Sequence, residues 1–293
     1  MEEKKVPEIK RDYKMKLMVW GVWFTLCFAA GVLLSFLFVN KKAFPDFTQR
    51  LLVRIGVSVV LGIVIEIILL GFVFPVVLNK DRKHLKETLT RINNEGYTPQ
   101  VMYLLDEGYA SVVNSDTRTG YANSYALYLC DAYISERLFD RALYYNSLVN
   151  TEELFRYSSI GLLFEQLLYY GQRIQLAAFT GNIPACEQVM RESQNLFSAS
   201  RGKNPMFDYI MDGSTFEYFF AVGDLARCEA LVRPYEQYFE LKYSVYNSLG
   251  RIYAKKGDTY AANQFFNKAL LAARNDYLKQ IVERERLIAV NGG

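Results

Sequence analysis

The stretch that decides the fold is residues 243–276, which read YSVYNSLGRIYAKKGDTYAANQFFNKALLAARND. A Gly257-Asp258 dipeptide, a typical turn signal, divides it into two halves. Apolar and small residues recur at helical spacing on both sides of this dipeptide: Tyr246, Leu249, Gly250 and Tyr253 before it, and Ala262, Phe266 and Ala269 after it. The stretch therefore predicts two helices joined by a tight turn.

This unit of 34 residues, with an aromatic and L-G-x-x-Y before the turn and A-x-x-x-F after it, resembles the tetratricopeptide repeat. The resemblance implies an all-α solenoid of stacked helix pairs whose concave surface binds peptides or partner domains. A second turn signal, Gly223-Asp224, stands 34 residues earlier, and Gly181-Asn182 lies 42 residues before that. A degenerate turn at Arg137-Leu138 lies a further 44 residues upstream, so we expect four units with insertions or divergent helices between the early ones.

Three of the four cysteines fall on packing positions of this pattern. Cys186 and Cys228 occupy the place that Ala262 has in the last unit, and Cys130 occupies the place of Gly250. We therefore interpret them as small packing residues and not as metal ligands or nucleophiles. Since the chain has no CxxC motif, neither a zinc module nor a disulfide framework is expected.

The resemblance implies that the first helix of each unit lines the concave surface. The outward positions in the last three units are Ser244, Asn247, Arg251 and Lys255, then Ile210, Gly213, Glu217 and Phe220, and then Leu168, Gln175 and Phe179. The predicted partner-binding residues among them are Asn247, Arg251, Lys255, Glu217, Phe220 and Gln175. Each of them also fits an ordinary solvated or packed position. Too few basic residues are present to carry over the family's carboxylate clamp.

Two long apolar runs precede the repeats. Residues 17–39 contain no charge, and residues 51–78 are interrupted only by Arg54 and Glu66. Since about 20 apolar residues span a bilayer, we expect a two-helix transmembrane hairpin over residues 17–78. A cleaved signal peptide is disfavoured because a second apolar run follows at once. Six basic residues before the first run and five after the second, against three in the loop 40–50, predict a multi-pass cell-membrane protein with both termini cytoplasmic.

Glu66 is the residue of the predicted hairpin whose carboxylate costs free energy to place near the middle of a membrane. It shares a helix face with Ser58 and Gly62, and the other run presents a similar face of small residues, so the predicted transmembrane interface comprises Ser58, Gly62, Glu66, Cys27, Gly31 and Ser35. Three interpretations stay open: a protonated Glu66 hydrogen-bonded within the hairpin or to a copy of itself, docking on another integral membrane protein, and an ion path.

The remaining segments complete the predicted organisation. Residues 1–16 form a cytoplasmic tail, residues 79–97 a basic juxtamembrane helix that contains His84, and residues 98–293 the repeat domain. The juxtamembrane helix is either a topology anchor or a contact for anionic headgroups of the lipid bilayer. The repeat domain is expected to begin with an extra helix over residues 98–114 and to end with a capping helix over residues 276–290 whose outer face is polar.

No catalytic constellation is present in the sequence. It contains one histidine, and it lacks the phosphate-loop, HExxH and G-x-S-x-G motifs, so we expect no enzyme, metal or cofactor. A net charge of +3 gives no reason to expect nucleic acid as a partner. The expected function is a membrane-anchored scaffold or adaptor that binds a protein or peptide in the cytoplasm. The alternatives are an accessory subunit of a membrane complex that docks through the Glu66 face and a peptide-sensing regulator.

Overall fold

The computed structural model describes residues 60, 74–114, 119–156 and 160–291. All regular elements in these ranges are helices, which confirms the predicted all-α class. The chain divides into two compact units, residues 1–83 and residues 84–293. Of the first unit only Val60 and the beginning of α3 (Phe74–Glu95) are described, so the fold presented below is that of the second unit.

The two membrane spans predicted from the sequence are not found. None of the helices in the described ranges is long and apolar enough to cross a bilayer. Residues 1–59 and 61–73 lie outside those ranges and include the tail, the first apolar run and all six predicted interface residues: Cys27, Gly31, Ser35, Ser58, Gly62 and Glu66. The end of the second run is part of α3, which continues from Phe74 into the charged stretch beginning at Lys80. The transmembrane hairpin and the multi-pass membrane location are therefore corrected, because the structure supports neither.

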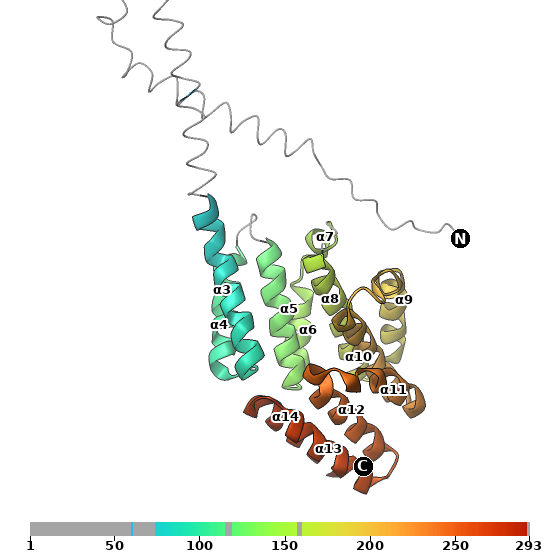
Figure 1. The fold of residues 1–293 in the computed structure, drawn as a ribbon. Helices are drawn as coiled ribbons and strands as arrows, with labels where there is room; N and C mark the ends of the chain where they lie inside the picture. Colours follow the sequence, from blue (N-terminus) through green and yellow to red (C-terminus); the bar gives the residue numbers. More distant parts are fainter. Residues whose placement is uncertain (1–59, 61–73, 115–118, 157–159, 292–293) are drawn as a thin grey trace, which may run out of the picture. The chain divides into compact units, whose positions relative to one another are not determined.

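The second unit is a succession of antiparallel helices (Figure 1). After α3 the helices are α4 (Pro99–Val112), α5 (Thr119–Ser135), α6 (Phe139–Ser147), α7 (Thr151–Leu154), α8 (Ile160–Phe179), α9 (Ile183–Ser200), α10 (Pro205–Val222) and α11 (Leu225–Val232). They are followed by two short 3₁₀ helices, η3 (Arg233–Gln237) and η4 (Phe239–Leu241), and by α12 (Lys242–Lys255), α13 (Thr259–Ala272) and α14 (Asp276–Asn291).

The four predicted turns are confirmed and share one backbone geometry. Gly181, Gly223 and Gly257 adopt left-handed φ angles of 71°, 82° and 80°, and Arg137 adopts a φ of 58° in the same place of the first turn. In each turn the next residue donates its N–H to a carbonyl five residues earlier, as from Asp258 to Tyr253 at 2.9 Å. This hydrogen bond is the signature of a Schellman motif, which ends a helix with a residue in the left-handed region.

The turns also begin the second helix of each pair. The side chains of Asn182, Asp224 and Asp258 accept hydrogen bonds from the backbone N–H three residues later, which caps α9, α11 and α13. Leu138 has no side-chain acceptor to offer at the corresponding place before α6. The first turn therefore has neither the glycine nor the capping side chain of the other three, which explains why its sequence signal is degenerate.

The predicted packing positions are buried. Ala142, Cys186, Cys228 and Ala262 are fully buried at equivalent places in the four pairs, and Cys130 is buried as well. The thiols of Cys186 and Cys228 each lie 3.6 Å from a backbone carbonyl oxygen twelve residues earlier. The interpretation of these three cysteines as packing residues is confirmed.

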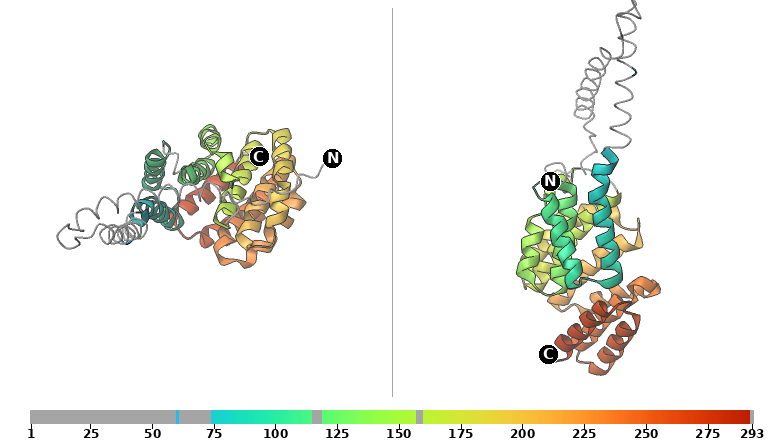
Figure 2. Two further views of the ribbon diagram at one scale, coloured as in Figure 1. Left: turned by 90° about the horizontal axis from the view of Figure 1, so that it is seen from above. Right: turned by 90° about the vertical axis from the view of Figure 1, so that its left-hand side faces the viewer.

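The last helix departs from the expectation of a simple cap. α14 begins at Asp276 as predicted, but it runs back across the ends of α3, α4 and α5 (Figure 1), and Figure 2 shows this end of the unit from two further directions. Tyr277 and Arg284 both donate hydrogen bonds to the Glu136 carboxylate, at 2.8 and 2.9 Å. Arg274 donates to the side-chain oxygen of Asn93 at 3.0 Å. Part of the polar face of α14 is therefore turned inward, where it joins the two ends of the helical array.

Candidate binding groove and inner cavity

A cavity of about 680 Å³ opens where the C-terminal ends of α5, α8, α10 and α12 meet α14. We call it the groove, and its walls are Arg137, Ala178, Phe179, Glu217, Phe220, Ala221, Arg251, Ala254, Lys255, Gly257, Glu285, Ile288 and Ala289. Its volume lies within the range of about 300–1,000 Å³ that is usual for ligand sites. The Schellman turns place these helix ends side by side, so the repeat geometry itself builds the groove.

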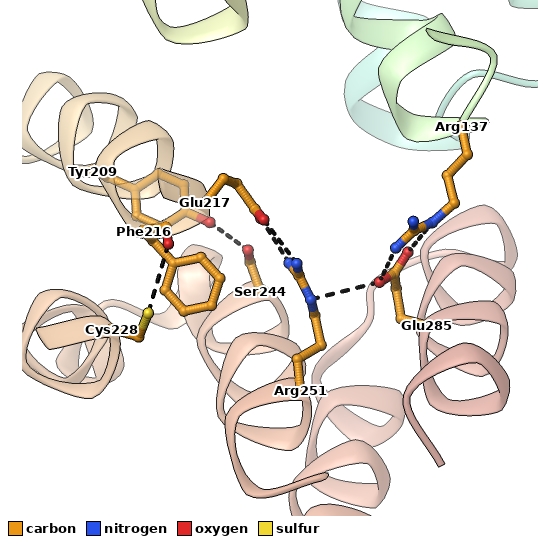
Figure 3. A network of polar contacts seen from close by, with 8 residues as sticks. All are labelled: Arg137, Tyr209, Phe216, Glu217, Cys228, Ser244, Arg251 and Glu285. Carbon is orange, nitrogen blue, oxygen red and sulfur yellow. Dashed lines mark hydrogen bonds and ion pairs between the residues drawn. The ribbon is translucent and has the colours of Figure 1, made fainter. Parts of the chain in front are cut away.

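An alternating chain of charges runs along the floor of the groove (Figure 3). Arg251 donates two hydrogen bonds to Glu217, at 2.6 and 2.7 Å, and its Nε lies 3.7 Å from Glu285. Glu285 in turn accepts two hydrogen bonds from Arg137, at 2.9 and 2.7 Å. The chain of ion pairs therefore connects α10, α12 and α14 with the turn after α5.

The Glu285 carboxyl and the Arg251 guanidinium stay ionised at neutral pH. Burial alone raises the pKa of the Glu285 carboxyl, but hydrogen bonds from Arg137 and the charges of Arg251, Arg137 and Arg284 outweigh it and leave that pKa lowered. Burial lowers the pKa of Arg251, yet the Glu217 and Glu285 carboxylates more than compensate and raise it. The floor of the groove is thus a set of ion-paired side chains that are largely shielded from water.

The cations of the groove rest on aromatic faces. The Arg251 guanidinium carbon lies 4.6 Å from the centroid of the Phe220 ring, and the ammonium of Lys255 lies 4.5 Å from the same centroid. Lys255 also donates a hydrogen bond to the Phe220 carbonyl oxygen at 2.5 Å. Arg137 lies 5.7 Å from the centroid of Phe179. Three cations and two carboxylates line the groove, which gives it a formal charge of +1.

A second, smaller cavity of about 250 Å³ shares Glu217 and Arg251 with the groove. We call it the inner cavity, and its walls are Asp131, Leu168, Gly171, Gln172, Gln175, Tyr209, Ile210, Asp212, Gly213, Phe216, Glu217, Leu231, Val232, Tyr235, Ser244, Val245, Asn247, Ser248 and Arg251. Most of these residues come from α8, α10 and α12. The first helices of successive pairs therefore enclose it.

Most polar side chains of the inner cavity have partners. Tyr209 donates to the hydroxyl of Ser244 (Figure 3), and Tyr235 donates to Asp212 at 2.6 Å. Asp212 also pairs with Arg201, whose nitrogen lies 2.7 Å away. Asp131 accepts a hydrogen bond from the hydroxyl of Tyr97 at 2.6 Å. Its burial raises the pKa of the Asp131 carboxyl, and the hydrogen bond from Tyr97 only partly offsets that effect.

The structure brings the six sequence-predicted groove residues together. Lys255 and Phe220 line the groove, Gln175 and Asn247 line the inner cavity, and Glu217 and Arg251 line both. The other five outward positions, Ser244, Ile210, Gly213, Leu168 and Phe179, also line one of the two cavities. Their placement follows from the repeat register, whereas their role in binding a partner stays a prediction.

Sequence reasoning missed Arg137, Glu285 and Asp131. Arg137 and Glu285 meet across 148 residues, and no local pattern signals a contact at that separation. One clue was present in the sequence: an arginine stands where the other three turns have glycine, which a side-chain contact can justify. The partner of His84 was missed as well: its Nδ1 lies 2.7 Å from the hydroxyl of Tyr125.

Two kinds of reactive group bear on a catalytic role: metal-ligand clusters and cysteine thiols. In the ranges that the structure covers, no group of three His, Cys, Asp or Glu side chains is placed to hold a metal ion. Burial raises the pKa of the Cys186 thiol to about 11 and that of the Cys228 thiol to about 12, so neither is a thiolate at neutral pH. Comparison with protein-family models, with curated proteins and with solved structures gave no match.

Proposed function

We propose that this chain is a non-enzymatic scaffold whose tetratricopeptide-like helix pairs hold a peptide or a segment of a partner protein in the groove. The observation that carries the proposal is the convergence of the first helices of successive pairs on one cavity of about 680 Å³. Stacked helix pairs in solenoid proteins present extended concave surfaces for such segments. The buried thiols, with their raised pKa values, speak against a cysteine nucleophile.

The lining of the groove indicates the chemistry of the partner. Phe179, Ala221 and Ile288 offer apolar surface, which favours an aliphatic or aromatic side chain. Lys255 is exposed, and within the described part of the chain its ammonium bonds to a backbone carbonyl and forms no ion pair. A carboxylate of the partner would therefore find a cation whose charge is not yet neutralised. We expect a segment that carries an acidic group next to an apolar residue.

The test is crosslinking of the full chain in the cells that produce it, followed by mass spectrometry of what is recovered. The groove variant is Lys255→Glu, which reverses the charge without touching the buried ion pairs. The matched control is Lys203→Glu, at an exposed position between α9 and α10 that lines neither cavity. Circular dichroism establishes that both variants are folded.

Wild type and Lys203→Glu are expected to recover the same partner, whereas Lys255→Glu recovers at least about tenfold less, because like charges then oppose each other at the contact. Equal recovery by both variants would mean that partners bind elsewhere on the chain, and the groove proposal would be wrong.

A further inference from the structure

The inner cavity holds one carboxylate whose charge is not neutralised. Four charged side chains line it: Asp131, Asp212 and Glu217 are acidic, and Arg251 is basic. Arg251 neutralises Glu217, and Arg201 neutralises Asp212 from outside the cavity. In the described ranges Asp131 forms no ion pair, and its hydrogen bond comes from the neutral hydroxyl of Tyr97. With these pairs counted, the cavity carries a formal charge of −1.

Asn247 supplies an acceptor that lacks a donor. Its Oδ1 is buried, and in the part of the chain that the structure describes it has no hydrogen-bond partner. A buried acceptor without a donor costs free energy that a bound donor recovers. Asp131 and Asn247 come from α5 and α12, and both line the same small cavity. Two independent observations therefore indicate that the cavity is built to receive hydrogen-bond donors.

Aromatic side chains line the same cavity as these acceptors. Tyr209 and Tyr235 line the cavity. Burial raises the pKa of the Tyr209 hydroxyl, and the charge of Asp131 contributes to that rise. Tyrosine faces attract cations, and the attraction is strongest where water is excluded. A carboxylate and an amide oxygen among tyrosines form a chemical environment that favours a cation with several N–H donors.

We propose that the inner cavity binds the ammonium group of a primary alkylamine, with the Asp131 carboxylate as its counter-ion and the Asn247 side-chain oxygen as a second acceptor. An ammonium group has three donors, one positive charge and no acceptor, which matches a carboxylate without a cationic partner and an amide oxygen without a donor. An inorganic anion would be repelled by Asp131. In the described ranges no group of three His, Cys, Asp or Glu side chains is placed to hold a metal ion.

The size of the cavity limits the ligand. A volume of about 250 Å³ is smaller than that of sites for drug-sized molecules and cofactors, which begin at about 300 Å³. It suits one long side chain or a small free amine. Glu217 and Arg251 line both cavities, so a lysine of a segment held in the groove is one source of the ammonium group, and a free amine is the other. The proposal does not depend on the groove being occupied.

The probes are n-butylammonium chloride and N-acetyl-lysine N-methylamide, titrated against the full chain and followed by saturation-transfer difference NMR. Their neutral counterparts are 1-butanol and the same lysine derivative acetylated on its ε-amine. The cavity variant is Asp131→Asn, which retains an acceptor for the Tyr97 hydroxyl but removes the charge. The matched control is Asp140→Asn, an exposed residue in the first turn of α6 that lines neither cavity.

Saturation transfer to both amines, and to neither neutral counterpart, is the expected result for wild type and for Asp140→Asn. With Asp131→Asn the dissociation constants should rise by at least about tenfold, because the charged partner of the ammonium is lost. Tighter binding of the lysine derivative than of n-butylammonium identifies a protein segment as the source, and the reverse order identifies a free amine.

The proposal is overturned if n-butylammonium shows no saturation transfer, if 1-butanol shows the same transfer, or if Asp131→Asn binds as wild type does. Should circular dichroism show that Asp131→Asn does not fold, Asn247→Ala replaces it, and an unchanged dissociation constant in that variant overturns the proposal equally. These titrations need no partner protein. A failure here combined with a crosslinked partner that depends on Lys255 leaves the scaffold function standing, so the two proposals fail separately.

Discussion

Gly250 shows how closely the helices of a pair approach each other. A Cβ atom at this position would lie 2.8 Å from ring atoms of Phe266, which is fully buried on the facing helix α13. Glycine costs helix stability, so its presence in the middle of α12 is justified only by this contact. The sequence pattern placed Gly250 and Phe266 in the motif correctly, because both belong to one local unit.

We expect Gly250→Ala to lower the free energy of unfolding by about 1–3 kcal/mol, since the added methyl group must displace a packed ring. The matched change is Gly213→Ala in the middle of α10, where a Cβ would meet no atom within 4 Å. That change should leave stability unaltered or raise it by about 0.5–1 kcal/mol. Urea denaturation of both variants measures the difference, and the same sign for both would contradict the packing argument.

Among the elements, α11 is the shorter second helix of the last two pairs. One carboxylate of α11, that of Glu229, joins it to its neighbours. Glu229 accepts hydrogen bonds from Lys256 at 2.8 Å and from Arg233 at 2.6 Å, and the hydroxyl of Tyr253 lies 3.3 Å away. Tyr253 belongs to α12 and Lys256 follows it, so their two contacts fasten α11 to the next pair. They lower the pKa of Glu229 to about 2 from an ordinary value of 4.5.

A lowered pKa makes the contribution of Glu229 depend on pH. The group stabilises the fold above pH 4.5, where it is ionised in both states, and this contribution disappears as the pH falls toward 2. Because the ion pairs are partly exposed to water, we expect Glu229→Gln to cost only about 1 kcal/mol at pH 7. Thermal denaturation from pH 7 downward should show the variant and wild type converging below pH 4.5.

Glu152→Gln is the control for this series, since Glu152 is 88% exposed and its nearest ion-pair contact is 3.6 Å. It should change stability by less than about 0.5 kcal/mol at every pH. A pH-independent loss in Glu229→Gln would show that the side chain acts through packing and not through its charge.

The helix α14 is the second element whose role can be measured. Val282 is fully buried against Ala262, Phe266 and Ala269 of α13, so α14 covers the apolar face that the last pair would otherwise expose. It also supplies the partners of Glu136 and Arg137. A chain ending at Asn275 should lose hydrogen-exchange protection both in α12 and α13 and in α5, although α5 is remote in sequence. Deletion of residues 292–293 is the control, and loss confined to α12 and α13 would contradict a structural link to α5.

At the scale of the whole helical unit, prediction from sequence succeeds where interactions are local. The three Gly turns, the small packing residues and the concave positions follow from a repeated unit and its register. The short elements α7, η3 and η4 were missed, because each belongs to a link that departs from the repeat. The inward turn of α14 was missed since Glu136 and Arg137 contact it across at least 141 residues.

The membrane prediction failed for a different reason. It treated residues 51–78 as one apolar segment that ends before a separate basic helix. In the described ranges the structure instead joins Phe74 and Lys80 in the single helix α3, which is not long and apolar enough to cross a bilayer. The apolar run ends at Leu78, but α3 continues to Glu95. Apolar content alone therefore did not locate the end of this helix.

The Arg137–Glu285 pair joins the end of α5 to α14, and its contribution to the free energy of unfolding can be measured. We expect the double-mutant cycle of Arg137→Met and Glu285→Gln to give a coupling energy of about 1–3 kcal/mol, as for partly buried ion pairs with two hydrogen bonds. The cycle cancels the separate loss of the contact between Glu285 and Arg251. Urea denaturation provides the four free energies, and a coupling near zero would show that α14 is held by its apolar face alone.

The closure by α14 has a consequence for synthesis on the ribosome. In an open repeat array each unit can fold as it leaves the ribosome, because it contacts only its neighbours. Here Arg137 leaves the ribosome 148 residues before Glu285, which corresponds to a delay of about 7–30 s at typical translation rates. During that time the nascent array has no partner from α14 for the end of α5. A helix translated late therefore completes the end of a helix translated early, and cells in which translation stalls before Asp276 would accumulate a chain that chaperones can still bind.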